Sequence, residues 1–150
     1  MDWDTYFMRI CQEVAAKSQD RSSRYGAVIV GRRDEILSTG YNGIPRGIPY
    51  DERYHTRPDK YMYFVHAEQN AIFNAAAVGT PIEGARMYVI HPPCAECTKA
   101  IIQSGIVEVV YEQELAIPET LSVDDWRQTM GASMEMLQRA GVTLRRGRGL

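Results

Sequence analysis

The spacing of apolar residues predicts a helix at the start of the chain and a two-stranded hairpin after it. From residue 3 to residue 18, apolar side chains recur every three or four positions, as on one face of a helix: Trp3, Phe7, Ile10, Cys11 and Val14. Residues 25–31 form a continuous apolar run, which is typical of a strand covered on both faces. A second strand is predicted from Ile36 to about Tyr41, and the short turn between the two makes the pair antiparallel.

The second half of the chain alternates helices with strands. Helices are predicted at 66–77, at 94–104 and from a capping box at Ser122 and Asp125 up to Gly141. The last of these helices has an apolar stripe of Trp126, Met130, Met134 and Leu137. Strands are predicted at 87–90, 106–111 and 142–144.

The connections between these elements predict the fold. About thirty residues containing a helix join the last two strands, and such a crossover connects parallel strands. The order of the elements then predicts an α/β fold, a three-layer α/β/α sandwich around a mixed five-stranded sheet.

Residues 42–62 interrupt this order with a long irregular stretch rich in glycine, proline and asparagine. A loop of this length in a compact domain is usually either functional or disordered. Four tyrosines in and beside it argue for order: Tyr50, Tyr54, Tyr61 and Tyr63. We therefore expect an ordered binding loop.

Length and composition indicate one soluble domain, residues 1–150, with 45% hydrophobic and 24% charged residues. The net charge of −2 argues against an extended nucleic-acid contact, and no apolar run approaches the ~20 residues of a membrane span. The N-terminus has no secretory signal pattern, so we expect a cytoplasmic protein. The basic tail at 145–150 is either a solvated end or a phosphate contact.

Two short motifs carry the candidate chemistry. His66-Ala67-Glu68 is an H-x-E motif, and Pro93-Cys94-Ala95-Glu96-Cys97 is a P-C-x-x-C motif. One imidazole and two thiolates fill three corners of a tetrahedral zinc site, and the open fourth corner is typical of a catalytic site. Together the motifs form the zinc-deaminase signature, in which the glutamate is a proton shuttle and not a ligand.

The spacing of these residues is consistent with that role. Cys94 and Cys97 share a face at the start of a helix, whose dipole stabilises thiolate. His66 and Glu68 are expected at the first turn of another helix, where both can point inward. A C-x-x-C pair alone would also suit a redox site or half of a structural zinc site. The only other cysteine is Cys11, which we expect to be a small buried hydrophobe.

From about Ser18 to Leu144 the chain resembles the deoxycytidylate (dCMP) deaminases of the cytidine-deaminase superfamily. Four stretches carry this resemblance: Ser18-Gln19-Asp20 with Ser23 and Gly26-Ala27, Gly40–Gly47, Lys60–Tyr63 with His66–Ile72, and Pro93–Cys97. The resemblance implies hydrolysis of dCMP to dUMP and ammonia, which supplies dUMP for dTTP synthesis. It also implies one catalytic Zn²⁺ on His66, Cys94 and Cys97, with Glu68 as the proton shuttle.

Further site residues follow from the same resemblance. Asn42 is expected to contact the substrate sugar, and the other expected substrate contacts are Ser23, Ala67 and Tyr111. The resemblance implies activation by dCTP and inhibition by dTTP, with Mg²⁺ accompanying the triphosphate and a homohexamer as the assembly. Residues 42–65 are the expected effector and substrate insert, with effector contacts at Gly43, Arg46, Gly47, Lys60 and Tyr61.

Three other functions remain open. Another small-molecule cytosine or guanine deaminase would use the same motifs. A nucleic-acid base deaminase is disfavoured by the charge of −2, and a zinc-stapled binding module by the open fourth ligand position. A second zinc, which some relatives hold in the insert, is not expected because the insert has His55 but no cysteine. His91 suits either the mouth of the active site or a structural position.

Overall fold

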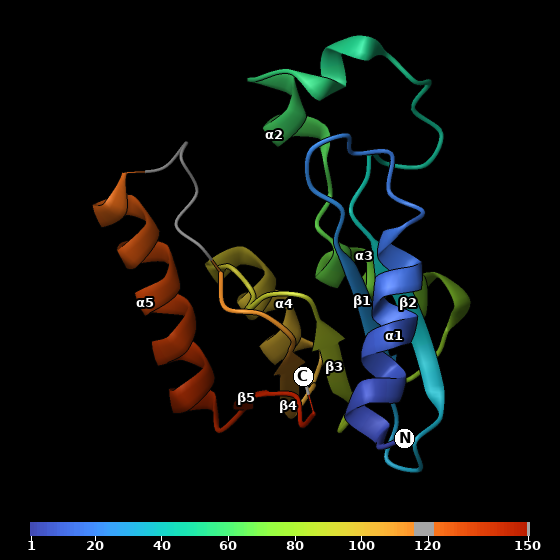
Figure 1. The fold of residues 1–150 in the computed structure, drawn as a ribbon, viewed down its shortest axis with the longest axis vertical. Helices are drawn as coiled ribbons and strands as arrows, with labels where there is room; N and C mark the ends of the chain where they lie inside the picture. Colours follow the sequence, from blue (N-terminus) through green and yellow to red (C-terminus); the bar gives the residue numbers. More distant parts are fainter. Residues whose placement is uncertain (116–121, 150) are drawn as a thin grey trace.

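The computed structural model describes residues 1–115 and 122–149, and five strands within them form one sheet in the order β2-β1-β3-β4-β5 (Figure 1). β1 (Gly26–Val30) pairs antiparallel with both β2 (Ile36–Tyr41) and β3 (Arg86–Val89). β4 (Glu108–Tyr111) and β5 (Thr143–Arg146) continue the sheet in parallel with β3. The predicted hairpin, the mixed five-stranded sheet and the parallel last pair are confirmed.

Helices cover both faces of this sheet. α1 (Trp3–Ala15) packs on one face, where its buried side chains Phe7, Met8 and Cys11 meet the strand residues Val28, Val30, Tyr88 and Val110. α3 (Ala67–Val78) and α4 (Ala95–Gln103) pack on the other face, and α5 (Val123–Ala140) packs against α4. Every residue of β1 is buried because both faces of this strand are covered, as its apolar run predicted. The three-layer α/β/α sandwich is therefore confirmed.

α3 lies unusually close to the sheet. A Cβ on Gly40 of β2 would lie 2.2 Å from the backbone nitrogen of Ala71, so only glycine fits at this position. The helix faces the strands with small side chains at four-residue spacing: Ala67, Ala71 and Ala75. It also holds β2 by its asparagines, because the amides of Asn70 and Asn74 donate to the carbonyl oxygens of Tyr41 and Thr39, each at 2.8 Å.

The insert at 42–65 is ordered, but the prediction of an irregular stretch was wrong in detail. It contains a 3-10 turn, η1 (Glu52–His55), and a short helix, α2 (Asp59–Tyr63). Asp51 caps η1 by accepting a hydrogen bond from the Arg53 backbone N–H at 3.0 Å. Tyr54 is buried and its ring lies 4.7 Å from the Tyr63 ring, so these tyrosines form a small core that composition alone does not reveal. The insert projects from one end of the sheet, whereas the start of α1 lies at the other (Figure 1).

The predicted helix at 3–18 ends earlier, at Ala15, and its apolar stripe was partly wrong. Trp3 is 54% exposed, whereas Asp4 is buried. Asp4 is buried because it accepts hydrogen bonds from the Arg145 guanidinium at 2.7 Å, the Tyr88 hydroxyl at 2.8 Å and the Arg148 backbone N–H at 2.9 Å. A distant cation thus accounts for the burial of Asp4 at the start of α1.

The prediction that residues 145–150 form a basic tail was also wrong in part. Arg145 and Arg146 belong to β5, and Arg145 forms ion pairs with both Asp4 and Glu108, each at 2.7 Å. Arg145 is therefore neither a solvated end nor an available phosphate contact. Leu150 lies outside the described residues.

α5 begins as predicted, with the Ser122 side chain accepting a hydrogen bond from the Asp125 backbone N–H at 3.0 Å. The prediction that Met134 belongs to the buried stripe of this helix was wrong, because its side chain is 44% exposed. α5 packs mainly on α4, so its buried stripe is narrow and comprises Met130, Ser133 and Leu137. In the described part of the chain, no helix has the length and hydropathy needed to cross a membrane.

Asp4→Asn should destabilise the fold in a pH-dependent way. Burial opposes ionisation of Asp4, but the hydrogen bonds from Arg145, Arg148 and Tyr88 outweigh it and lower the pKa of this carboxyl. Its stabilising contribution is therefore present above ~pH 4, the pKa of a free aspartate, and is lost as the pH falls towards the lower folded pKa. At pH 7 we expect a loss of about 2 kcal/mol in the free energy of unfolding, the usual contribution of charged hydrogen bonds.

Urea unfolding of both proteins at pH 7, 4 and 2.5 measures this effect. The difference between wild type and Asp4→Asn should narrow as the pH falls. Glu13→Gln, at an exposed position of the same helix, should change stability by less than about 0.5 kcal/mol. If the difference in the free energy of unfolding between wild type and Asp4→Asn stayed constant down to pH 2.5, the ionised carboxylate of Asp4 would not be the source of the stabilisation.

Candidate metal centre and active site

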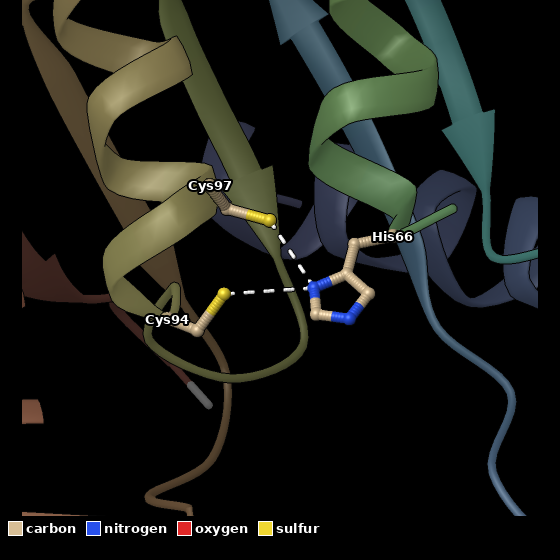
Figure 2. Close-up of side chains that lie close together, drawn as sticks. All are labelled: His66, Cys94 and Cys97. Carbon is tan, nitrogen blue, oxygen red and sulfur yellow. Dashed lines mark hydrogen bonds between the residues drawn. The ribbon is translucent and has the colours of Figure 1, made fainter. Parts of the chain in front are cut away.

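The two sulfurs and the imidazole of the sequence motifs converge at the starts of two helices. His66 is the N-cap of α3, Cys94 is the N-cap of α4, and Cys97 lies in the first turn of α4. Figure 2 shows the three side chains pointing toward one another from these helix starts. The His66 Nδ1 atom lies 3.5 Å from the Cys94 Sγ atom and 3.3 Å from the Cys97 Sγ atom. The convergence expected from the sequence is observed.

These distances fit a tetrahedral zinc ion. With sulfur at about 2.3 Å and nitrogen at about 2.1 Å from zinc, a sulfur and a nitrogen ligand lie about 3.6 Å apart. All three ligand atoms lie within 4.8 Å of one another, so one ion can reach all of them. Within residues 1–115 and 122–149, this is the one group of at least three His, Cys, Asp or Glu side chains with such geometry. Three donors leave one of the four zinc positions for a reactant.

The pKa values of the three side chains differ, and that of Cys94 favours a thiolate at neutral pH. Hydrogen bonds with Cys97 and His66 lower the pKa of Cys94 to about 4, although burial opposes this shift. The hydrogen bond to Cys94 and burial raise the pKa of Cys97. The hydrogen bond with Cys94 raises the pKa of His66 to about 9. Without metal, the site is therefore a thiolate beside an imidazolium and a thiol.

Glu68 lies beside this cluster, in the first turn of α3 as predicted. Its Oε2 atom is 3.7 Å from the Cys97 Sγ atom. Burial raises the pKa of Glu68 above its ordinary value. A carboxyl with a raised pKa can both accept and return a proton near neutral pH, which is the requirement for general acid–base catalysis.

Asn42 holds the segment 20–25 in place. Its side-chain oxygen accepts a hydrogen bond from the Tyr25 backbone N–H at 2.8 Å, and its amide nitrogen donates to the Ser23 carbonyl at 2.9 Å. Asp20 reinforces this segment by accepting hydrogen bonds from the backbone N–H groups of Ser22 and Ser23. The amide of Asn42 is thus occupied within the chain, and its contact with a substrate sugar stays a prediction.

The other expected substrate contacts lie on different elements, and Tyr111 packs against the same core cluster as Ala67. Ala67 is buried directly after His66, and Tyr111 ends β4 with its hydroxyl donating to Glu114 at 2.6 Å. The structure adds a ring pair that sequence reasoning missed, Tyr25 and His91, whose ring centroids lie 5.6 Å apart. The sequence has no signal for this pair, because the two residues come from β-strand ends far apart in the chain.

The residues expected at the effector site are partly engaged in internal contacts. Gly43 forms a backbone bridge with Val65, while Arg46 and Gly47 are exposed. Lys60 forms an ion pair with Asp20 at 3.0 Å. Tyr61 is 60% exposed, with the Arg57 guanidinium 4.8 Å from its ring centroid. In the same insert, His55 lies 2.9 Å from the Tyr50 hydroxyl.

A family model and the sequences of known proteins both match this chain to cytidine and deoxycytidylate deaminases. The family model of the cytidine and deoxycytidylate deaminase zinc-binding region matches residues 1–113. Mouse deoxycytidylate deaminase is 37% identical over 152 residues, which cover 97% of this chain and 80% of that protein. Human deoxycytidylate deaminase is 41% identical over 117 residues, 74% of this chain and 65% of that protein.

The structural comparison agrees. The crystal structure of the dCMP deaminase from cyanophage S-TIM5 in complex with dCMP and dUMP has a TM-score of 0.73 and 28% sequence identity to this chain. The match covers 95% of this chain and 94% of that one. All residues of the cluster lie inside the range matched by the family model.

Zinc binding should release about two protons per ion at pH 7. His66, with a pKa of about 9, and Cys97, whose pKa is raised, both carry protons that a metal must displace, whereas Cys94 is already a thiolate. The apparent affinity should therefore rise about a hundredfold per pH unit between pH 6 and 8, since two protons are displaced. Isothermal titration in buffers of different ionisation enthalpy counts the protons.

Cys11→Ala serves as the control, because Cys11 lies on α1, where it is buried against β1 and β3 on the face of the sheet opposite α3 and α4. It should release the same number of protons as wild type, whereas Cys97→Ser should bind zinc much more weakly. An affinity that did not depend on pH would contradict the assigned protonation states.

Proposed function

Because this chain belongs to the cytidine and deoxycytidylate deaminase family, we propose that it is a zinc-dependent dCMP deaminase. The reaction is hydrolytic: dCMP and water give dUMP and ammonia. The observation that carries the proposal is the converged His66, Cys94 and Cys97 cluster with Glu68 beside it. The likeness to a dCMP- and dUMP-bound deaminase over nearly the whole chain supports the choice of substrate.

His66, Cys94 and Cys97 would hold the zinc, since their donor types and spacing suit this ion. Bound there, zinc supplies Lewis-acid activation of water for attack on the pyrimidine ring. The protein contributes the thiolate of Cys94 and the placement of both helix starts, which bring the three donors together.

Glu68 moves the protons in this proposal. Hydrolysis places the oxygen of water on ring carbon C4, and the amino group leaves as ammonia. The carboxylate of Glu68 transfers the two protons of water one after the other: it accepts the first and delivers it to ring nitrogen N3, then accepts the second from the oxygen now on C4 and delivers it to the leaving amine. Its raised pKa suits both directions of transfer.

Substrate contacts are proposed at Asn42, Ser23, Ala67 and Tyr111. The support is the resemblance in the segments that carry them, together with the packing of Tyr111 against the same core cluster as Ala67. The internal hydrogen bonds of Asn42 suggest a concrete form for its role. By holding Ser23 and Tyr25, it presents the 20–25 segment in one conformation to the sugar and phosphate.

Regulation by dCTP and dTTP with Mg²⁺, and assembly as a homohexamer, are proposed on the resemblance of the insert. The proposed effector contacts are Gly43, Arg46, Gly47, Lys60 and Tyr61. Lys60 has a partner in Asp20, so an effector phosphate would have to replace this carboxylate or bind beside it. Binding of an effector would then loosen or restrain the 20–25 segment that Asp20 organises.

A nucleotide panel tests the function. Zinc-loaded protein should convert dCMP with a kcat/KM at least about tenfold above deoxycytidine and cytidine, because loss of charged hydrogen bonds to a phosphate costs about 1.5–3 kcal/mol. Guanine should not react. Each substrate is assayed by ammonia release with and without dCTP and Mg²⁺. Turnover of cytidine without turnover of dCMP would overturn the proposal, while indifference to dCTP would overturn only the regulation.

Glu68→Gln should abolish turnover without loss of the metal. Removing a general acid–base group slows a reaction by about 10²–10⁴-fold, and the amide cannot carry the proton. Elemental analysis should still find one zinc per chain, since Glu68 is not a ligand in this proposal.

The matched control for this variant is Glu96→Gln. Glu96 lies in the P-C-x-x-C motif itself, but its side chain is 73% exposed and pairs with Lys99. This variant should retain wild-type kcat. Activity in Glu68→Gln comparable to that of the control would remove the proton-shuttle assignment.

A further inference from the structure

We propose that Ser133, on α5, is a positioning residue for the metal-bearing turn at the start of α4. It supplies no ligand and lies 36 positions after Cys97 in the chain. Its buried hydroxyl nevertheless connects α5 to the peptide unit that precedes Cys94. The inference rests on the proposed zinc site and goes beyond it, because it makes metal retention depend on a helix outside both motifs.

The contacts of Ser133 are short and shielded from water. Its Oγ atom donates a hydrogen bond to the Pro93 carbonyl oxygen at 2.8 Å and lies 2.6 Å from the Oγ1 atom of Thr98. Ser133 is 1% exposed and Thr98 is fully buried. A hydroxyl carries a single proton, and that of Ser133 is used on Pro93. The Thr98 hydroxyl must therefore donate to the Ser133 hydroxyl, which in turn donates to the Pro93 carbonyl oxygen.

These hydrogen bonds involve residues on both sides of Cys94 in the sequence, Pro93 and Thr98. The Pro93 carbonyl belongs to the peptide unit whose nitrogen is that of Cys94, so restraining the carbonyl restrains the plane from which Cys94 extends. On the other side, the Thr98 backbone N–H donates to the Cys94 carbonyl at 2.9 Å. Ser133 thus contacts the residue before Cys94 and the residue that holds the first turn of α4.

A serine at this position needs an explanation. The other buried positions of α5 are apolar, Met130 and Leu137. A buried hydroxyl destabilises a helix interface unless it is hydrogen-bonded, and alanine would fill the same narrow space without this cost. The polar side chain is consistent with a role that alanine cannot fulfil, namely fixing the Pro93 carbonyl.

The test uses the 150-residue chain loaded with Co²⁺ in place of Zn²⁺. The visible spectrum of Co²⁺ reports the geometry of its thiolate and imidazole ligands, and transfer of Zn²⁺ to a chelator reports metal retention. Ser133→Ala should shift the Co²⁺ bands and release Zn²⁺ about tenfold faster, as is common when the support of a metal ligand is removed. Thr98→Val, which keeps the shape of the side chain and removes its hydroxyl, should act in the same direction and serves if Ser133→Ala does not fold.

Leu137→Ala is the control for general loss of packing. Leu137 is buried on the same helix and has no polar side-chain atom, so its truncation weakens α5 without touching the Pro93 carbonyl. It should leave the Co²⁺ spectrum unchanged. The inference is overturned if Ser133→Ala and Thr98→Val match wild type in spectrum and release rate, or if Leu137→Ala shifts the bands equally. Wild-type protein that bound neither ion would overturn the proposed function itself, and this inference with it.

Discussion

The close packing of α3 on the sheet is the constraint from which the site follows. Gly40 has no side chain, and the alanines of α3 let the helix lie almost against β2. This contact determines where the helix begins, and therefore where His66 and Glu68 are. The cysteines come from α4, the neighbouring helix on the same face of the sheet. A larger residue at position 40 would separate the imidazole from the sulfurs even though every candidate ligand remained.

Hydrogen bonds from segments without candidate ligands hold other parts of the chain in place. On one side, Asp20 and Asn42 bind the 20–25 segment, and Lys60 connects it to the insert. On the other side, Ser133 restrains the turn before Cys94. In both arrangements the buried polar atoms named here have hydrogen-bond partners, and such satisfied networks favour a single geometry of the segments they join. The proposed chemistry rests on four residues, whereas these hydrogen bonds come from four other parts of the chain: the 20–25 segment, Asn42, Lys60 and Ser133.

The sequence predicted those parts of the structure that depend on local signals. Apolar runs revealed the strands, and the H-x-E and P-C-x-x-C motifs identified the cluster and the helix starts. The errors concern residues whose environment is set by distant partners. Asp4 is buried only because Arg145 reaches it, and Ser133 rather than Met134 faces inward because α5 packs on α4. The η1 turn and α2 in the insert depend on contacts between tyrosines, which periodicity does not record.

The pairing of Asp4 with Arg145 also has a consequence for synthesis. The first helix buries a carboxylate whose partner is translated 141 positions later. While the ribosome is still making the intervening chain, this carboxylate has no cation and favours water, so α1 docks fully only after β5 has emerged. Residues 66–97 precede β5 in the chain, so all four residues of the proposed site are synthesised before this ion pair can form.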